Sequence, residues 1–198
     1  MTVDKNDLVK IDITDAINNF ATYIAKKREL FEYPRQGYGD YNSRGINSIK
    51  AGIFGELAFL EFMHSEIEKK FGSLPTEKRN DILHKKIKFS YDIKIGAFDP
   101  GFDFKLADKT IDIKTYEKNK VTIDEIFKWR NGRPLSLLID RNQTAIADYY
   151  VQAFLMKDNK VCLGGYHKGL PPLQEWMPNP AYTCAVPDLI PIKDIINF

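Results

Sequence analysis

Two aspartates and a lysine lie in two short segments whose side chains alternate between apolar and charged. Apolar residues alternate with Asp103 in residues 102–106, and with Asp112 and Lys114 in residues 110–114. A period of two residues is typical of a strand with one buried face, so the two segments predict a β-hairpin. The charged side chains are then expected on the face that points away from the apolar core.

The register of this hairpin decides how close the charges come. If Phe104 lies opposite Ile111, Asp103 falls opposite Asp112 and the two side chains lie about 5 Å apart. A register slipped by two residues places Asp103 opposite Lys114 instead. In either register, Asp103, Asp112 and Lys114 share one face of the hairpin.

The chemistry that such a set supports is metal-assisted hydrolysis of a phosphodiester. Two close carboxylates raise each other's pKa unless a positive charge lies between them. Mg²⁺ suits this position, because it takes one or two carboxylates as ligands and keeps other positions for water and phosphate. Lys114 is placed to polarise a water or to stabilise charge on a phosphate. The alternative is an ordinary hairpin with one solvated face, which shows the same alternation.

A carboxylate interrupts the apolar stripe of the clearest predicted helix, residues 47–70. Glu56 lies in the middle of this stripe, where an uncompensated charge costs several kcal/mol, so a cation, a hydrogen-bonding partner or a metal is expected beside it. The alternative is a buried Glu56 paired with a structural arginine or lysine. Gly52 and Gly55 each lower helix propensity by about 1 kcal/mol relative to alanine, which indicates close approach of another backbone. The apolar stripe consists of Ile49, Ile53, Leu60, Met63 and Ile67.

These segments, in this order, resemble the motifs of the PD-(D/E)XK nuclease superfamily, which has the restriction-endonuclease-like fold. The matching segments are Lys50-Ala-Gly-Ile-Phe-Gly-Glu56-Leu-Ala-Phe, then Pro100-Gly-Phe-Asp103, then Ile111-Asp112-Ile113-Lys114-Thr115. The resemblance implies an α/β fold with a mixed central β-sheet flanked by helices. It also implies that Glu56, Asp103, Asp112 and the carbonyl of Ile113 bind Mg²⁺ or Mn²⁺, and that Lys114 is the catalytic lysine.

The sequence departs from the family pattern in two places. The proline and aspartate of the motif are separated by two residues, and no clear amphipathic helix follows Lys114. Residues 116–134 instead predict a strand at 121–123 and a short turn at 125–129. A second Asp-x-Lys, Asp92-Ile93-Lys94, ranks below the first because no hairpin partner that begins with Gly-x-Asp precedes it.

Composition indicates a single domain, residues 1–198, with the motif-bearing core at about 47–166. The chain has 198 residues, of which 43% are hydrophobic, enough for a substantial core. The 29 basic and 27 acidic residues give a net charge of +2, which disfavours a histone-like blanket binder but permits a nucleic-acid enzyme with one basic face. Two distant cysteines and three histidines disfavour a disulfide framework or a structural zinc site.

The remaining elements are predicted from the period of the apolar residues and from the residues that begin or end helices and strands. A first helix is expected at about 15–31, a surface connection at 72–86, and later strands at 135–139, 149–156 and 161–166. The first seven residues have no apolar signal region, and no segment approaches the roughly 20 apolar residues of a membrane span. A cytoplasmic protein with reduced cysteines is therefore expected.

Substrate contacts are predicted from a loop rich in glycine, tyrosine and arginine at residues 34–45. Arg35, Arg44 and Lys50 are candidates for binding phosphates near the metal. The alternative is an ordinary mobile surface loop. The leading hypothesis is a Mg²⁺- or Mn²⁺-dependent DNA endonuclease that acts as a homodimer, as many such nucleases do. The alternatives are an RNA endonuclease of the same fold and a non-catalytic nucleic-acid-binding protein on a nuclease-like scaffold.

Overall fold

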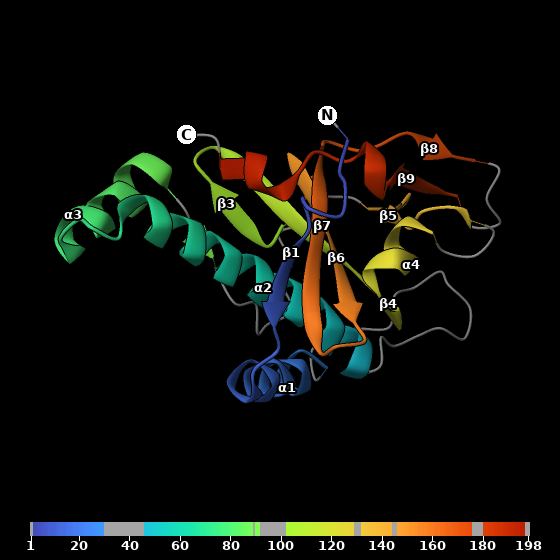
Figure 1. Cartoon of the computed structure of the whole chain (residues 1–198), viewed down its shortest axis with the longest axis horizontal. Helices are drawn as coiled ribbons and strands as arrows, with labels where there is room; N and C mark the ends of the chain where they lie inside the picture. The colour runs from blue at the N-terminus through green and yellow to red at the C-terminus, as the bar shows by residue number, and fades with distance from the viewer. Residues whose placement is uncertain are drawn as a thin grey trace.

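A mixed sheet of six strands forms the centre of the protein and carries helices on one face (Figure 1). The computed structural model describes residues 2–29, 46–88, 90–91, 102–128, 132–143, 146–175 and 180–196. The sheet has the order β1-β7-β6-β4-β3-β2. Its strands are β1 (Val9–Asp12), β2 (Ser90–Tyr91), β3 (Phe104–Leu106), β4 (Lys109–Val121), β6 (Tyr149–Met156) and β7 (Lys160–Lys168). The α/β class expected from the sequence is confirmed, and the sheet is mixed because β4 runs parallel to β6 and antiparallel to β3.

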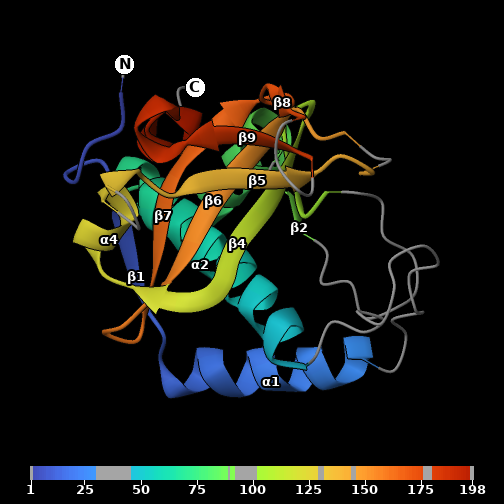
Figure 2. The ribbon, with the colours of Figure 1, turned by 90° about the vertical axis from the view of Figure 1, so that its right-hand side faces the viewer.

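A second sheet of three strands, in the order β5-β9-β8, lies over the opposite face of the main sheet (Figure 2). Its strands are β5 (Ser136–Asp140), β8 (Leu173–Gln174) and β9 (Ala181–Ala185). The long strand β4 curls at its far end, where it leads into the short helix α4 (Ile123–Phe127). The segment from α4 through β5 therefore connects the parallel strands β4 and β6 and brings the small sheet against them.

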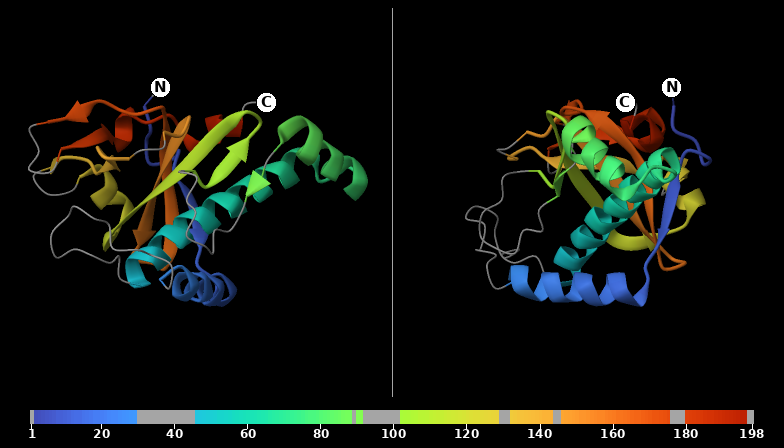
Figure 3. Two further views of the ribbon diagram at one scale, coloured as in Figure 1. Left: turned by 180° about the vertical axis from the view of Figure 1, so that it is seen from behind. Right: turned by 90° about the vertical axis from the view of Figure 1, so that its left-hand side faces the viewer.

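Helix α2 (Ile46–Phe71) covers the first face of the main sheet, and helix α1 (Asp15–Glu29) packs against α2 beyond the end of β1 (Figure 3). Helix α1 begins where the hydroxyl of Thr14 accepts a hydrogen bond from the Ile17 backbone N–H, as an N-cap does. Helix α2 packs against α1 and against β4. Within the described residues, no helix is long and apolar enough to cross a membrane.

The main sheet separates two apolar cores. On the side of α2, Ile111 and Ile113 of β4 pack with Val151 and Ala153 of β6. On the side of the small sheet, the buried side chains include Tyr150, Phe154, Leu137 and Ile139. This division follows the alternation of side chains along β4 and β6 and fixes which face each polar residue of these strands occupies.

The hairpin of β3 and β4 has the first of the two registers considered from the sequence. Phe104 pairs with Ile111, and Leu106 pairs with Lys109 across a two-residue turn. Ala107 occupies this turn with a positive φ of 56°, the left-handed conformation that such tight hairpin turns require. The slipped register, which places Asp103 opposite Lys114, is therefore wrong, and Asp103 itself lies directly before the paired residues of β3.

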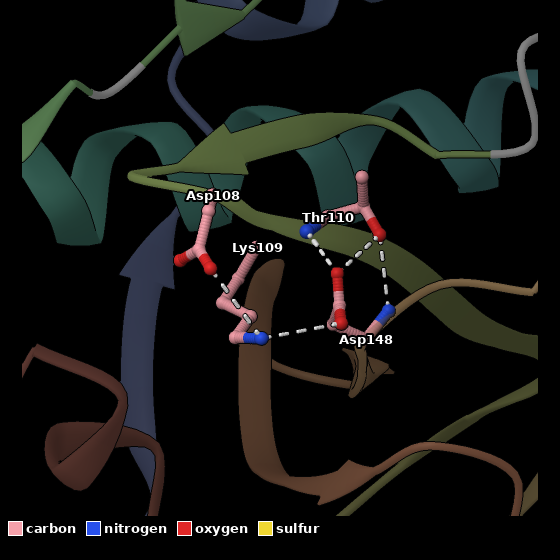
Figure 4. A network of polar contacts seen from close by, with 4 residues as sticks. All are labelled: Asp108, Lys109, Thr110 and Asp148. Carbon is pink, nitrogen blue, oxygen red and sulfur yellow. Dashed lines mark hydrogen bonds and ion pairs between the residues drawn. The ribbon is translucent and has the colours of Figure 1, made fainter.

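Asp148 anchors the start of β4 to the start of β6 (Figure 4). Its Oδ2 accepts hydrogen bonds from the backbone N–H of Thr110 at 2.8 Å and from the Thr110 hydroxyl at 3.0 Å. The Asp148 backbone N–H donates to the Thr110 hydroxyl in return, at 3.0 Å. The backbone hydrogen bond from Thr110, more than the nearby Lys109, lowers the pKa of Asp148.

Two predictions about local structure need correction. Residues 72–86 were expected to be a surface connection, but they contain α3 (Thr76–Asp81) and most of a π-helix, η1 (Ile82–Ile87). The pattern fails there because α3 has no buried residue and so no apolar stripe. The strand expected at 121–123 was wrong: Val121 ends β4, and Thr122 caps α4 in a capping box with Glu125.

The N- and C-terminal segments also contribute elements. Strand β1 was not predicted, since four residues are too few to define a period; it pairs antiparallel with β7. In the C-terminal segment, the 3₁₀ turn η3 (Val186–Asp188) is followed by the 3₁₀-helix η4 (Ile192–Ile196). The apolar side chains of η4 pack into the core on the side of α2, and Val186 of η3 packs into the core on the side of the small sheet.

Candidate functional site

Asp112 and Lys114 lie side by side on the face of β4 that points toward the small sheet. Their neighbours Ile113 and Thr115 point the other way, since both would contact a Cβ placed on Gly55 of α2. The Nζ of Lys114 lies 2.8 Å from Oδ2 of Asp112. Asp112 is 7% exposed, so this carboxylate is almost removed from water and its neighbours control its charge.

A glutamine that follows strand β5 of the small sheet donates a hydrogen bond to Asp112. Gln143 follows β5 in a turn, and its Nε2 donates to Oδ2 of Asp112 at 2.9 Å. The same amide lies 3.3 Å from the hydroxyl of Tyr150 on β6, which also accepts from the backbone N–H of Ala147 at 3.0 Å. Burial, together with the nearby charge of Asp112, raises the pKa of Tyr150, which keeps the phenol neutral. Among the described residues, Oδ1 of Asp112 accepts no hydrogen bond.

A second glutamine holds the backbone of β4 at the same level. Gln152 of β6 pairs with Lys114 and is 2% exposed. Its Nε2 donates to the carbonyl of Lys114 at 3.0 Å and to the carbonyl of Ala153 at 2.7 Å. An irregularity in the pairing of β6 with β7 falls between Gln152 and Ala153. Such bulges re-aim a side chain locally, and here the bulge accompanies an amide that reaches across to β4.

Asp103 lies at the edge of β4, directly before β3 begins. Its backbone N–H donates to the carbonyl of Ile111 at 2.8 Å, and its Oδ2 accepts from the backbone N–H of Ile113 at 2.8 Å. The carboxylate thus continues the β3 ladder by one step. Because the N–H and C=O of one residue in a strand point toward the same neighbouring strand, the carbonyl of Ile113 is expected on the side of Asp103.

Glu56 is buried in α2, and its direct partner is an arginine of α1. The Nη1 of Arg28 lies 2.8 Å from Oε1, and Nη2 lies 2.9 Å from Oε2, a two-point pairing that matches the planes of both groups. The side chains are 18% and 8% exposed, respectively. The structural arginine that was the alternative to a metal beside Glu56 is therefore present, and it balances the charge of Glu56.

The three predicted carboxylates are not gathered into one cluster. Helix α2, which carries Glu56, packs on the face of β4 that bears Ile113, whereas Asp112 projects from the other face. In the part of the chain that the structure describes, no group of three Asp, Glu, His or Cys side chains is arranged to hold a metal ion. The metal-binding role of Glu56, Asp103, Asp112 and Ile113 remains a prediction.

The donor set fits a hard divalent cation in part. Asp112 has an oxygen without a hydrogen bond from any described residue, and Asp103 lies at the adjacent edge of β4. Carboxylate oxygens beside a main-chain carbonyl are ligands that Mg²⁺ accepts. Glu56 fits less well, because both of its oxygens already accept hydrogen bonds from Arg28, although each oxygen keeps a second lone pair.

Of the three residues predicted to contact phosphate, only Lys50 lies within the described part of the chain. Lys50 lies on the first turns of α2 with its Nζ 5.4 Å from the centre of the Phe54 ring. Arg35 and Arg44 lie outside the described residues, as does the second Asp-x-Lys at 92–94. Sequence reasoning missed Arg28, Gln143 and Gln152, because each reaches the site from an element distant in the chain.

Comparison with known proteins found no match: no protein-family model, no curated protein and no solved structure is similar to this chain. The residues around Asp112 therefore carry the functional inference.

Proposed function

We propose that this protein is a metal-dependent endonuclease that hydrolyses phosphodiester bonds of DNA at Asp112 and Lys114. The single observation that carries the proposal is the shielded pair itself: a lysine 2.8 Å from a carboxylate that is 7% exposed and has one oxygen free of hydrogen bonds from the described residues. An ion pair that served stability alone would not require a lysine side chain that is 29% exposed. Nor would it require a carboxylate oxygen that accepts no hydrogen bond from the described residues. The α/β topology, with α2 before β3 and β4, has the order that the family resemblance implies.

Each residue of the site has a proposed task. Asp112, Asp103 and the carbonyl of Ile113 would hold Mg²⁺ or Mn²⁺, which supplies Lewis-acid stabilisation of the negative charge that develops on the phosphate. The ammonium of Lys114 would hold the attacking water by hydrogen bonding and add positive charge beside the phosphate. Gln143 would fix the Asp112 carboxylate in one orientation.

Cleavage of supercoiled plasmid DNA tests the proposal. The wild-type protein is expected to nick or cut the plasmid with Mg²⁺ or Mn²⁺ and to be inactive in EDTA. Lys114→Met and Asp112→Asn are each expected to lower the rate by about 10²–10⁴-fold, the usual contribution of a proton-transfer or charge-stabilising group. Lys105→Met removes an exposed lysine of the same hairpin and should leave the rate unchanged.

Two outcomes would contradict the proposal. One is cleavage that continues in EDTA, and the other is full activity in both Lys114→Met and Asp112→Asn. A single-stranded RNA substrate, assayed in parallel, distinguishes the DNA endonuclease from the RNA endonuclease. Light scattering measures the oligomeric state: a homodimer is proposed, and a strict monomer would favour a nickase.

A further inference from the structure

A helical arm, residues 68–88, projects from the end of α2 away from both sheets (Figures 1 and 3). The buried stripe of α2 ends at Ile67, and the following Glu68, Lys69 and Lys70 are exposed. The arm then continues through α3 and η1. Phe71 and Ile82 pack against the core on the side of α2, and the arm contributes no fully buried side chain among the residues described there.

The arm carries more positive charge than the whole chain. Its seven basic residues are Lys69, Lys70, Lys78, Arg79, Lys85, Lys86 and Lys88, and its three acidic residues are Glu68, Glu77 and Asp81. With histidine counted as neutral, the arm has a net charge of +4, against +2 for the chain, so the remaining residues sum to −2. The charge of the whole chain is thus the sum of +4 on the arm and −2 on the remaining residues.

Ion pairs within the arm involve some of its basic residues, and other lysines of the arm form no such pair with the described residues. Arg79 pairs with Glu68 of α2, and Lys85 pairs with Asp81 at 2.5 Å. Lys78 and Lys88 are exposed and form no ion pair with any described residue. Helix α3 has no buried side chain, so its charged residues lie at the surface and are not explained by packing of the helix into a core.

We propose that the arm binds the phosphate backbone of duplex DNA, an inference that rests on the proposed nuclease function. Lysines and arginines at the surface neutralise phosphates and give a contact without sequence preference. Helix α3 (Thr-Glu-Lys-Arg-Asn-Asp) has no apolar residue to enter a bilayer, which disfavours an anionic membrane. The arm contains one aromatic side chain of the Phe, Tyr or Trp type, Phe71, so it lacks the stacking surface that single-stranded nucleic acid requires.

Fluorescence anisotropy with a labelled duplex of about 20 base pairs, in EDTA to prevent cleavage, tests this inference. The full chain with Lys78→Gln and Lys88→Gln together is compared with a matched variant, Lys10→Gln with Lys193→Gln, which removes two exposed lysines outside the arm. Each lost phosphate contact should lower the slope of log Kd against log salt by about 0.9, so a slope reduced by up to about 2 is expected for the arm variant. The matched variant should retain the wild-type slope and affinity.

The outcomes separate this inference from the nuclease proposal. If the arm variant binds the duplex with wild-type affinity and slope, the inference is wrong, whether or not the wild-type protein cleaves plasmid with Mg²⁺. If the arm variant loses affinity and slope but the wild-type protein does not cleave, the inference stands and the nuclease proposal fails. Binding to phosphatidylserine vesicles without binding to the duplex would overturn the inference in favour of a membrane.

Discussion

Arg28 of α1 and Glu56 of α2 form a buried two-point ion pair, with both carboxylate oxygens within 2.9 Å of the guanidinium nitrogens. Removing one partner of such a pair leaves a charge with little water around it, which costs about 3–5 kcal/mol. We therefore expect Arg28→Met and Glu56→Gln each to lower the free energy of unfolding in urea. The double variant Arg28→Met with Glu56→Met should lose less than the sum of the single losses, and additive losses would show that the pair is not coupled.

The same ion pair bears on metal binding. Because Arg28 already balances the charge of Glu56, we expect Glu56→Gln to change the affinity for Mn²⁺ little, whereas Asp112→Asn should lower it about 10-fold or more, as loss of a site residue does. Calorimetric titration of Mn²⁺ into the folded proteins measures both affinities. A comparable loss in Glu56→Gln would make Glu56 a direct ligand, as the family resemblance implies.

Gln143 is expected to matter for the site more than for the fold. Its amide orients Asp112 at 2.9 Å, and loss of such a supporting hydrogen bond typically lowers activity or metal affinity by about 10–100-fold. Gln143→Ala should therefore lower the plasmid-cleavage rate by at least about 10-fold while the thermal transition moves by only a few degrees. The control is Asn142→Ala, at the exposed preceding position. Equal rates for the two variants would remove Gln143 from the site.

Asp148 should make the stability of the protein depend on pH in the acid range. Hydrogen bonds from Thr110 lower the pKa of Asp148 in the folded state, so its contribution is fully present above the unfolded value and is lost as the pH falls through the folded value. Asp148→Asn should therefore be less stable than wild type at pH 7, and the difference should shrink below about pH 4. The measurement is urea denaturation from pH 3 to 7. Asp108→Asn, at a carboxylate that is 84% exposed, is the control.

Two glycines of α2 should respond in opposite ways to alanine. A Cβ on Gly55 would lie 2.1 Å from Oγ1 of Thr115 and 3.1 Å from Cγ2 of Ile113, whereas one on Gly52 would meet nothing within 4 Å. Gly55→Ala is expected to destabilise the protein by about 1–3 kcal/mol through overpacking. Gly52→Ala should be neutral or stabilise by up to about 1 kcal/mol through helix propensity. Thermal unfolding of both variants measures this difference, and Thr115→Ala should partly rescue Gly55→Ala.

The elements around the site were predictable wherever one face is buried. The two apolar cores impose a period of two on β3 and β4 and a helical period on α2, so the sequence predicts these elements. It leaves two registers for the hairpin, and the structure selects the one that pairs Phe104 with Ile111. The arm was missed for the converse reason, since nothing in α3 is buried. Close approach was expected at both Gly52 and Gly55, and it is present only at Gly55, where the neighbours are side chains of β4 and β6 and not backbone; a Cβ on Gly52 would meet nothing within 4 Å.

The sequence by itself determined which residues can do chemistry and that Asp112 and Lys114 share one face of a strand. Only the tertiary structure decided their partners: Arg28 for Glu56, and Gln143 for Asp112. The physical reason is that alternation within an element follows from local geometry, whereas pairing between elements depends on packing across long stretches of chain. A buried carboxylate demands a partner, but its own sequence neighbourhood does not specify which residue will supply it.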